Sequence, residues 1–210
     1  MEKNTGVYKN CISFRLEVIE NDCECLFERN ARAMGRNQRE VRRTEYVSYC
    51  EQFKAIEYIV CQQFENGTAA VVRKGLFDHR LYFGDTNDWR DSNIREYLNK
   101  EYFKELAAQF GEDNIVEFTR DLISIDGYDD YGKCRDKVSI MSLLDYMKYH
   151  KDIGDCENIY YLLTPATILS GCSYKTVLYI DDNDLPNYTL CGSIMAVRPF
   201  FVLKSDIYVF

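Results

Sequence analysis

Histidine is scarce in this sequence, which contains two histidines and one tryptophan among 210 residues. With so few histidines and no Gly-x-Ser-x-Gly motif, a serine or cysteine hydrolase has little support. Gly-rich phosphate loops, low-complexity segments and internal repeats are also absent. We therefore expect a protein that is not an enzyme and that uses no cofactor.

Long apolar runs are missing as well. No run approaches the roughly 20 residues that a membrane helix needs, so we expect no membrane association. The first residues, Met-Glu-Lys-Asn-Thr-Gly, lack the basic and apolar regions of a signal peptide. The cytoplasm of a host cell is therefore the expected compartment. A net charge of -8 argues against nucleic-acid binding by the surface as a whole.

Metal-binding cysteine motifs are lacking, although the chain holds nine cysteines. No Cys-x-x-Cys pair exists, the closest spacing is Cys23-Glu24-Cys25, and only His79 and His150 could add imidazole ligands. We expect reduced, mostly buried thiols and no metal, with a zinc site as the alternative. The cysteines are residues 11, 23, 25, 50, 61, 134, 156, 172 and 191.

The sequence does have the apolar content for a core, at 46% hydrophobic residues. We expect one domain over residues 53–210, preceded by an elaboration over residues 1–52. In that elaboration, residues 11–18 alternate apolar and polar residues, which predicts a half-exposed strand. Residues 25–41 carry arginines at intervals of three and four, which share one face if the segment is helical.

This arginine stripe consists of Arg29, Arg32, Arg36 and Arg39. Residues 28–43 hold six arginines and two glutamates, a net charge of +4, which leaves -12 for the rest of the chain. One interpretation is a solvated helix face that pairs with the protein's own acidic surface. The other is a docking face for an acidic partner or nucleic acid.

Turn and capping signals place the next elements. Asn66-Gly67 between the apolar runs 55–61 and 68–72 predicts a β-hairpin. Ser92 or Asn93 can cap a helix that ends at Gly111, with Glu96 completing a capping box. Ser142 opens a second capped helix that ends near His150. Strands are expected over residues 115–125 and 138–141, with a loop over 126–136 that does not match a calcium-binding spacing.

Three apolar runs in the C-terminal fifth predict buried strands: 159–164, closed by Pro165, 174–180 and 194–203. Arg198 lies inside the third run, so we expect buried partners to hold it beside the Pro165 turn. The tryptophan, Trp89, is most simply a core anchor.

Four blocks of sequence resemble an uncharacterised bacterial and phage domain family over roughly residues 53–203. Its members carry a Trp-Trp-Leu-Arg-Ser-Pro-like segment and end in Gly-Val-Arg-Pro-Ala. The matching blocks are 160–165 (Tyr-Tyr-Leu-Leu-Thr-Pro), 196–200 (Ala-Val-Arg-Pro-Phe, including Pro199), 89–99 and 136–145. Two positions depart from the family pattern: Leu163 stands where an Arg is usual, and Ala196 replaces a Gly.

That family is similar to the C-type-lectin-like fold, which is also used by formylglycine-generating enzymes. The resemblance implies an α+β domain with a twisted, mostly antiparallel sheet and two capped helices, in a host-cell protein or a phage particle. The fold hosts unrelated functions. The oxidase branch uses closely spaced cysteines, and Cys172 and Cys191 lie in no matching motif.

Lectin-like folds present ligands on long loops, which leads us to expect a non-catalytic module that binds an unknown protein or a small polar ligand. The expected surface is the loops 166–173 and 181–193, where an aromatic residue lies near acceptors. The alternatives are ordinary turn residues, a catalytic derivative of the fold, or docking through the arginine stripe. Calcium-dependent sugar binding has weak support, because Leu185 cannot ligate calcium. The expected ligand-binding residues are Asp181, Asp182, Asn183, Asp184 and Tyr188.

Overall fold

The computed structural model describes residues 13–14, 56, 58–77, 80–154, 158–169 and 175–205. Apart from Phe14 and Ile56, these residues belong to one unit of the chain. Strand β1 (Ser13–Phe14) falls within the strand expected over residues 11–18. The arginine stripe, with Arg29, Arg32, Arg36 and Arg39, lies outside the described residues.

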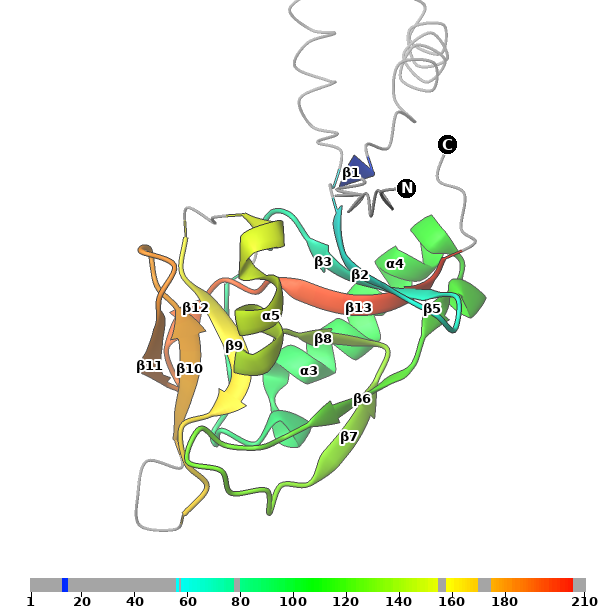
Figure 1. Ribbon diagram of the computed structural model, residues 1–210. Helices are drawn as coiled ribbons and strands as arrows, with labels where there is room; N and C mark the ends of the chain where they lie inside the picture. The colour runs from blue at the N-terminus through cyan, green and yellow to red at the C-terminus, as the bar shows by residue number, and fades with distance from the viewer. Residues whose placement is uncertain are drawn as a thin grey trace, which may run out of the picture. The chain divides into compact units, whose positions relative to one another are not determined.

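The main sheet has six strands in the order β1-β2-β3-β13-β5, and β8 also pairs with β13. Strand β13, near the C-terminal end of the described residues, thus lies beside the β2–β3 hairpin (Figure 1). This hairpin was predicted, and its turn places Gly67 at a φ of 75°, which glycine adopts without strain. The bounds are β2 (Tyr58–Phe64), β3 (Thr68–Arg73), β5 (Ile115–Val116), β8 (Val138–Ile140) and β13 (Pro199–Lys204).

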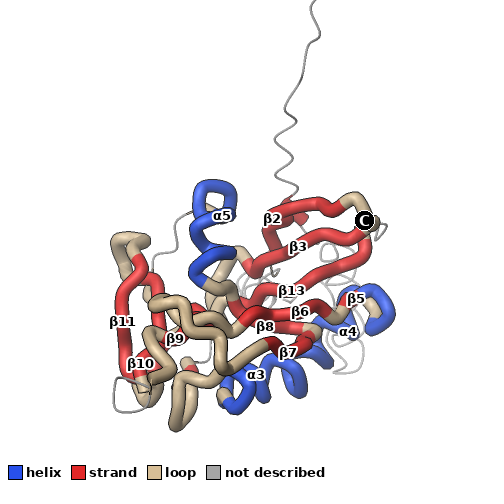
Figure 2. The backbone as a smooth tube through the Cα atoms, turned by 60° about the horizontal axis from the view of Figure 1, so that its bottom comes forward, coloured by secondary structure: helices blue, strands red, loops and turns tan. Residues whose placement is uncertain are grey.

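Alternation along the central strands gives the main sheet two buried faces. On one face, Phe201 packs edge-to-face against Tyr58, which in turn contacts Phe110 of helix α4 (Phe103–Phe110). On the other, Val72 and Phe200 join the core beneath helix α5 (Leu143–Ile153). Figure 2 shows the helices on opposite sides of the sheet.

Helix α3 (Asn93–Tyr97) continues through a π-helical segment, η2 (Leu98–Tyr102), into α4. Ser92, and not Asn93, is the N-cap: its side chain accepts a hydrogen bond from the backbone of Arg95. Glu96 is therefore one residue too far along to complete the expected capping box, and it pairs with Lys100 instead. Gly111 ends α4 with a φ of 81°, as predicted.

The predicted Ser142 cap of α5 is confirmed. The Ser142 side chain accepts from the Asp145 backbone, and the Asp145 carboxylate accepts from the Ser142 backbone, so both halves of a capping box are present. The helix runs to Ile153, three residues beyond the predicted end, and Gly154 follows it with a φ of 65°.

A second sheet of three strands lies in the order β11-β10-β9. Two short two-stranded sheets, β4 with β12 and β6 with β7, complete the strand pairing, and two short 3-10 helices, η1 and η3, flank the α3–α4 region. The bounds are β4 (Leu81–Tyr82), β6 (Phe118–Asp121), β7 (Lys133–Asp136), β9 (Tyr160–Pro165), β10 (Thr176–Ile180), β11 (Pro186–Leu190), β12 (Ile194–Met195), η1 (Trp89–Asp91) and η3 (Glu112–Asn114).

The described unit is therefore a mixed α+β domain with mostly antiparallel sheets, as expected. Among the helices of the described ranges, none is long and apolar enough to cross a membrane.

Candidate functional site

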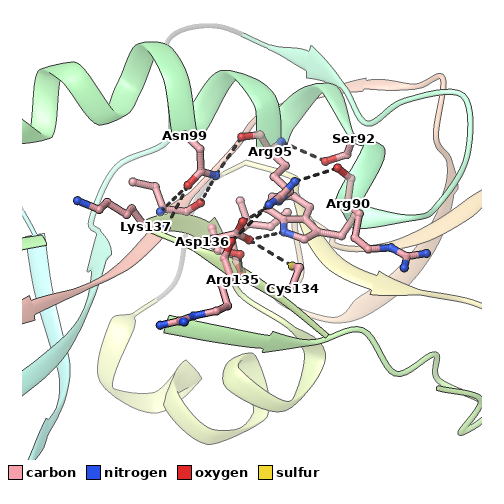
Figure 3. Close-up of polar contacts among 12 residues, drawn as sticks. Arg90, Ser92, Arg95, Asn99, Cys134, Arg135, Asp136 and Lys137 are labelled. Atoms are coloured by element: carbon pink, nitrogen blue, oxygen red, sulfur yellow. Dashed lines mark hydrogen bonds and ion pairs between the residues drawn. The ribbon is translucent and has the colours of Figure 1, made fainter. Parts of the chain in front are cut away.

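A polar network beneath α3 is centred on the buried carboxylate of Asp136 (Figure 3). Trp89 Nε1 donates to Asp136 Oδ2 at 2.7 Å, and Arg95 Nε donates to Oδ1 at 2.6 Å. Arg95 also donates to the carbonyl oxygens of Arg90 and Arg135. Each oxygen of the buried anion has a charged or polar donor, which is what a stable buried charge requires.

Asn99 extends this network to β8 (Figure 3). Its Oδ1 accepts from the backbone amides of Lys137 and Val138, and its Nδ2 donates to the carbonyl oxygens of Arg95 and Val138. Three of these four bonds tie the helical segment to the strand and the residue before it. A hollow of about 310 Å³ lies over this region, but the arrangement serves to join elements, and nothing in it favours a particular ligand.

The residues expected to be structural are buried. Trp89 is 0% and Arg198 1% exposed, and Pro165 ends β9 where a strand end was expected, while Pro199 begins β13. The Arg198 guanidinium donates to the carbonyl oxygens of Arg73, Lys74 and Ile153 and lies over the Tyr160 ring. Tyr160 begins β9, so these partners lie at the end of the strand away from Pro165.

The β10–β11 turn contains four of the five residues expected to bind a ligand, all except Tyr188. Asp181 Oδ1 accepts from the backbone amides of Asn183 and Leu185, so this carboxylate shapes the turn. Asp184 has a φ of 57°, and its carbonyl oxygen accepts from Tyr146 Oη at 2.7 Å. These contacts support the interpretation of Asp181 and Asp184 as turn residues.

Asp182, Asn183 and Tyr188 are exposed. The Asn183 side-chain amide donates to Asp182 Oδ1 at 3.1 Å, so these two neighbours interact at the tip of the turn. Tyr188 lies on β11 and not in the turn, opposite Leu178 of β10. The structure thus divides the expected site in two. The acidic residues lie in the turn, and Tyr188 lies on β11, which begins two residues after Asp184.

Strand β11 carries an uncovered apolar face. Residues directly opposite each other in an antiparallel pair point to the same side of the sheet. Leu178 and Ile180 of β10 are buried in the core. Tyr188 and Leu190 of β11 lie on the same side of the sheet as these two residues, and they are 53% and 65% exposed. The apolar face of the sheet therefore continues beyond the core into solvent. We call Tyr188 and Leu190 the β11 face.

Polar contacts hold the base of this small sheet. The side chain of Asn87, fully buried, donates to the carbonyl oxygens of Thr167, just after β9, and Thr176, at the start of β10. Its Oδ1 accepts from Tyr131 Oη. A second exposed apolar pair, Tyr82 and Ile194, lies in register across β4 and β12.

The three described cysteines are free, and each thiol is held in its protonated form. Burial raises the pKa of Cys61 to about 12 and that of Cys191 to about 12. Burial, and then the Asp136 carboxylate, raises the pKa of Cys134 to about 11. A nucleophilic or metal-binding cysteine needs the opposite shift. In the part of the chain that the structure covers, no group of three or more His, Cys, Asp or Glu side chains could hold a metal ion.

Sequence reasoning missed Leu190, because it assigned residues 181–193 to a loop. It placed Ile194 in a run that was expected to be buried, and Ile194 is 65% exposed. It assigned no strand at Tyr82. The five residues of β11 begin with Pro186, a residue that tolerates the first position of a strand. Tyr188 and Leu190 recur with the period of two that is typical of a strand, so this signal was available in the sequence.

No family model matches the chain, and neither curated proteins nor solved structures show significant similarity to it.

Proposed function

We propose that this domain is a non-catalytic binding module with a C-type-lectin-like fold, of the bacterial and phage family that its sequence blocks resemble. Its partner in this proposal is an extended segment of another protein, which binds along β11. The observation that carries the proposal is the β11 face, where two large apolar side chains continue a buried sheet face into solvent.

The edge position of β11 supports the mode of binding. Among the described residues β11 pairs only with β10, so it is the outer strand of the three-stranded sheet. An edge strand presents backbone groups to which an extended peptide can add as a further strand, while its side chains contact alternate residues of the peptide. Tyr188 is suited to such a contact, because an aromatic ring buries much area at a small entropic cost.

The acidic turn gives the partner a charge preference. Asp182 is exposed at the tip of the β10–β11 turn, close in sequence to Asp181 and Asp184. A basic residue in the partner, placed beyond the apolar contacts, would complement these carboxylates and increase the association rate more than the affinity. The proposed partner segment is therefore apolar in its centre and basic at one end.

The pairing of the last strand with the first hairpin supports the lectin-like fold. Strand β13 pairs with β3, so the first hairpin and the last strand of residues 58–205 meet in the main sheet, and the segments between them carry the loops. Asn87 holds the base of the small sheet, which gives the loops the rigid support that binding loops need.

The rival functions have less support. A formylglycine-generating-like oxidase needs a reactive thiol, and burial holds the Cys191 thiol protonated. The Cys172 partner that such chemistry would need, and the arginine stripe of the third hypothesis, lie outside the described residues.

The proposal is tested by selecting binders from a displayed random peptide library and measuring their affinity for three purified proteins. These are the wild type, the Tyr188→Ala/Leu190→Ala variant and a matched control, Leu144→Ala/Met147→Ala. The control removes two side chains of α5 that are 71% and 60% exposed. We expect the β11 variant to lose roughly tenfold or more in affinity and the control to bind as wild type does. Equal affinities for all three would remove β11 from the site.

A further inference from the structure

A hollow of about 330 Å³ lies on the α5 side of the main sheet, at the end formed by the β2–β3 hairpin. Strands β5, β6 and β13 and helix α5 supply the rest of its wall, and these elements can be followed in Figure 2. Its volume lies at the lower end of the range for small-molecule sites. The apolar wall consists of Ala70 and six larger side chains, Phe64, Val116, Phe118, Tyr149, Phe200 and Val202.

Arg120 lies in this wall with only 6% of its surface exposed. Its guanidinium is within 5.4 Å of the Phe118 ring centre and 5.5 Å of the Phe200 ring centre. Nη2 donates to Asp145 Oδ2 at 2.5 Å and to the carbonyl oxygen of Ile140 at 3.0 Å. Both hydrogen bonds that the guanidinium makes within the described residues therefore come from a single nitrogen.

The Nε of Arg120 is buried and has no acceptor among the described residues. A buried donor without a partner is unusual and costly in a folded protein, so an acceptor oxygen at this guanidinium would be bound favourably. The polar rim offers none: Asn66 Oδ1 already accepts from Thr68, and the Glu117 carboxylate pairs with Arg135.

The local charges indicate an uncharged acceptor. Asp145 already neutralises Arg120, and Arg135 neutralises Glu117, so a carboxylate in the hollow would gain no net attraction from these pairs and would meet the negative oxygens of Asp145 and Glu117. An amide or ketone oxygen can accept from the guanidinium without this repulsion. Four aromatic rings in the wall favour a flat aromatic body, which packs edge-to-face or offset against them.

We propose that this hollow is a second ligand site, independent of the β11 face, and that it binds a small uncharged aromatic molecule with a carbonyl oxygen. The carbonyl accepts from the Arg120 guanidinium, and the ring contacts Phe64, Phe118 and Tyr149. The site binds aromatic amides, and it does not bind aromatic carboxylates of the same shape.

The test uses three probes of nearly equal size: benzamide, benzoate and toluene. The readout is the Arg120 Nε–H resonance in ¹⁵N-labelled protein, which reports directly on a new acceptor. We expect benzamide to shift this resonance with a dissociation constant in the roughly millimolar range, as suits a fragment of this size. Benzoate and toluene should shift it at least several-fold less at equal concentration.

Two variants locate the binding. Val116→Phe fills the hollow from β5 and should abolish the benzamide shift, whereas Ile123→Phe places the same side chain at an exposed position away from the hollow and should preserve it. Phe64→Ala is a second test that does not depend on whether Val116→Phe folds. It removes a partly exposed ring from the wall and should weaken benzamide binding at least threefold. The proposal is overturned if benzamide leaves the Arg120 resonance unmoved, if benzoate matches it, or if Phe64→Ala binds as the wild type does.

Discussion

The indole Nε1 of Trp89 donates a 2.7 Å hydrogen bond to Asp136 Oδ2, joining the start of the α3 region to the end of β7. Both residues are buried, at 0% and 2% exposure, and the second carboxylate oxygen is bound by Arg95. One acidic side chain thus fixes the orientation of the tryptophan and of the helix that follows it.

We predict that Asp136→Ala destabilises the domain by about 3 kcal/mol, because it leaves both the Trp89 N–H and the Arg95 guanidinium without their acceptor. The free energy of unfolding in urea measures this loss. Asp121→Ala is the control, since its ion pair with Lys133 is largely exposed and should matter little. Similar stabilities for the two variants would mean that the network is not a structural anchor.

A second prediction concerns Arg198→Leu. The change removes the buried guanidinium that donates to three carbonyl oxygens, a buried bond to Ile153 and part-buried bonds to Arg73 and Lys74. We expect a loss of about 3 kcal/mol and a fall of Tm by roughly 6–12 °C. Arg135→Leu, at an exposed position, should lower Tm much less. An unchanged melting temperature in Arg198→Leu would contradict a structural role for this arginine.

The Arg120–Asp145 pair predicts a dependence of stability on pH. Burial raises the pKa of Asp145, but the Arg120 charge and the hydrogen bonds from Ser142 outweigh it, and the pKa is lowered overall. A lowered pKa in the folded state stabilises the protein at neutral pH, and this contribution is lost as the pH falls through the folded-state pKa.

Asp145→Asn should therefore unfold more easily than wild type at about pH 7, by about 3 kcal/mol. The difference should narrow as the pH is lowered below about 4, where the carboxylate of the unfolded wild-type chain begins to be protonated while the folded one is still charged, and it should be lost as the pH falls through the folded-state pKa. Urea unfolding over a pH series measures both. A difference that stays constant across the series would show that the charge of Asp145 is not what stabilises α5.

Local signals account for the parts of the fold that the sequence predicted. Gly67 specifies the hairpin turn through a positive φ that few other residues tolerate, and Ser142 with Asp145 specifies a helix start. Both signals act over four residues or fewer, so they depend little on the rest of the fold. The predicted apolar runs became β9, β10 and β13 for a similar reason, because nearly continuous apolar segments must be buried.

The missed elements depend on distant partners. Strand β7 is polar and exists because it pairs with β6, and the apolar run 194–203 is interrupted at residues 196–198 where Arg198 meets its carbonyl partners. The Arg120 hollow was also missed, since its lining residues come from six separate elements. Only the tertiary structure brings them together.

The arginine stripe yields a prediction of its own. Arg32→Glu/Arg36→Glu reverses two charges of the +4 segment, and it should abolish binding to any acidic partner that docks there. A pull-down from the native host, comparing wild type with this variant, identifies such a partner. Retention of every partner by the variant would mean that the stripe is a solvated surface.

For the acidic turn, Asp182→Ala should slow association of a basic selected peptide and reduce its salt dependence, while changing the dissociation rate little. Stopped-flow measurements at two ionic strengths separate these effects. Glu112→Ala, an exposed acid remote in sequence, is the control. An association rate that is insensitive to Asp182 would remove the turn from the site and leave only the apolar contact.

The most direct test of strand addition is amide hydrogen exchange of the domain with and without a saturating peptide selected on it. New hydrogen bonds at an edge strand slow exchange at that strand, whereas a peptide bound elsewhere leaves it unchanged. We predict that the amides of β11 slow by about tenfold or more on binding while those of α4 do not change. Protection of other segments with β11 unaffected would contradict the proposed function.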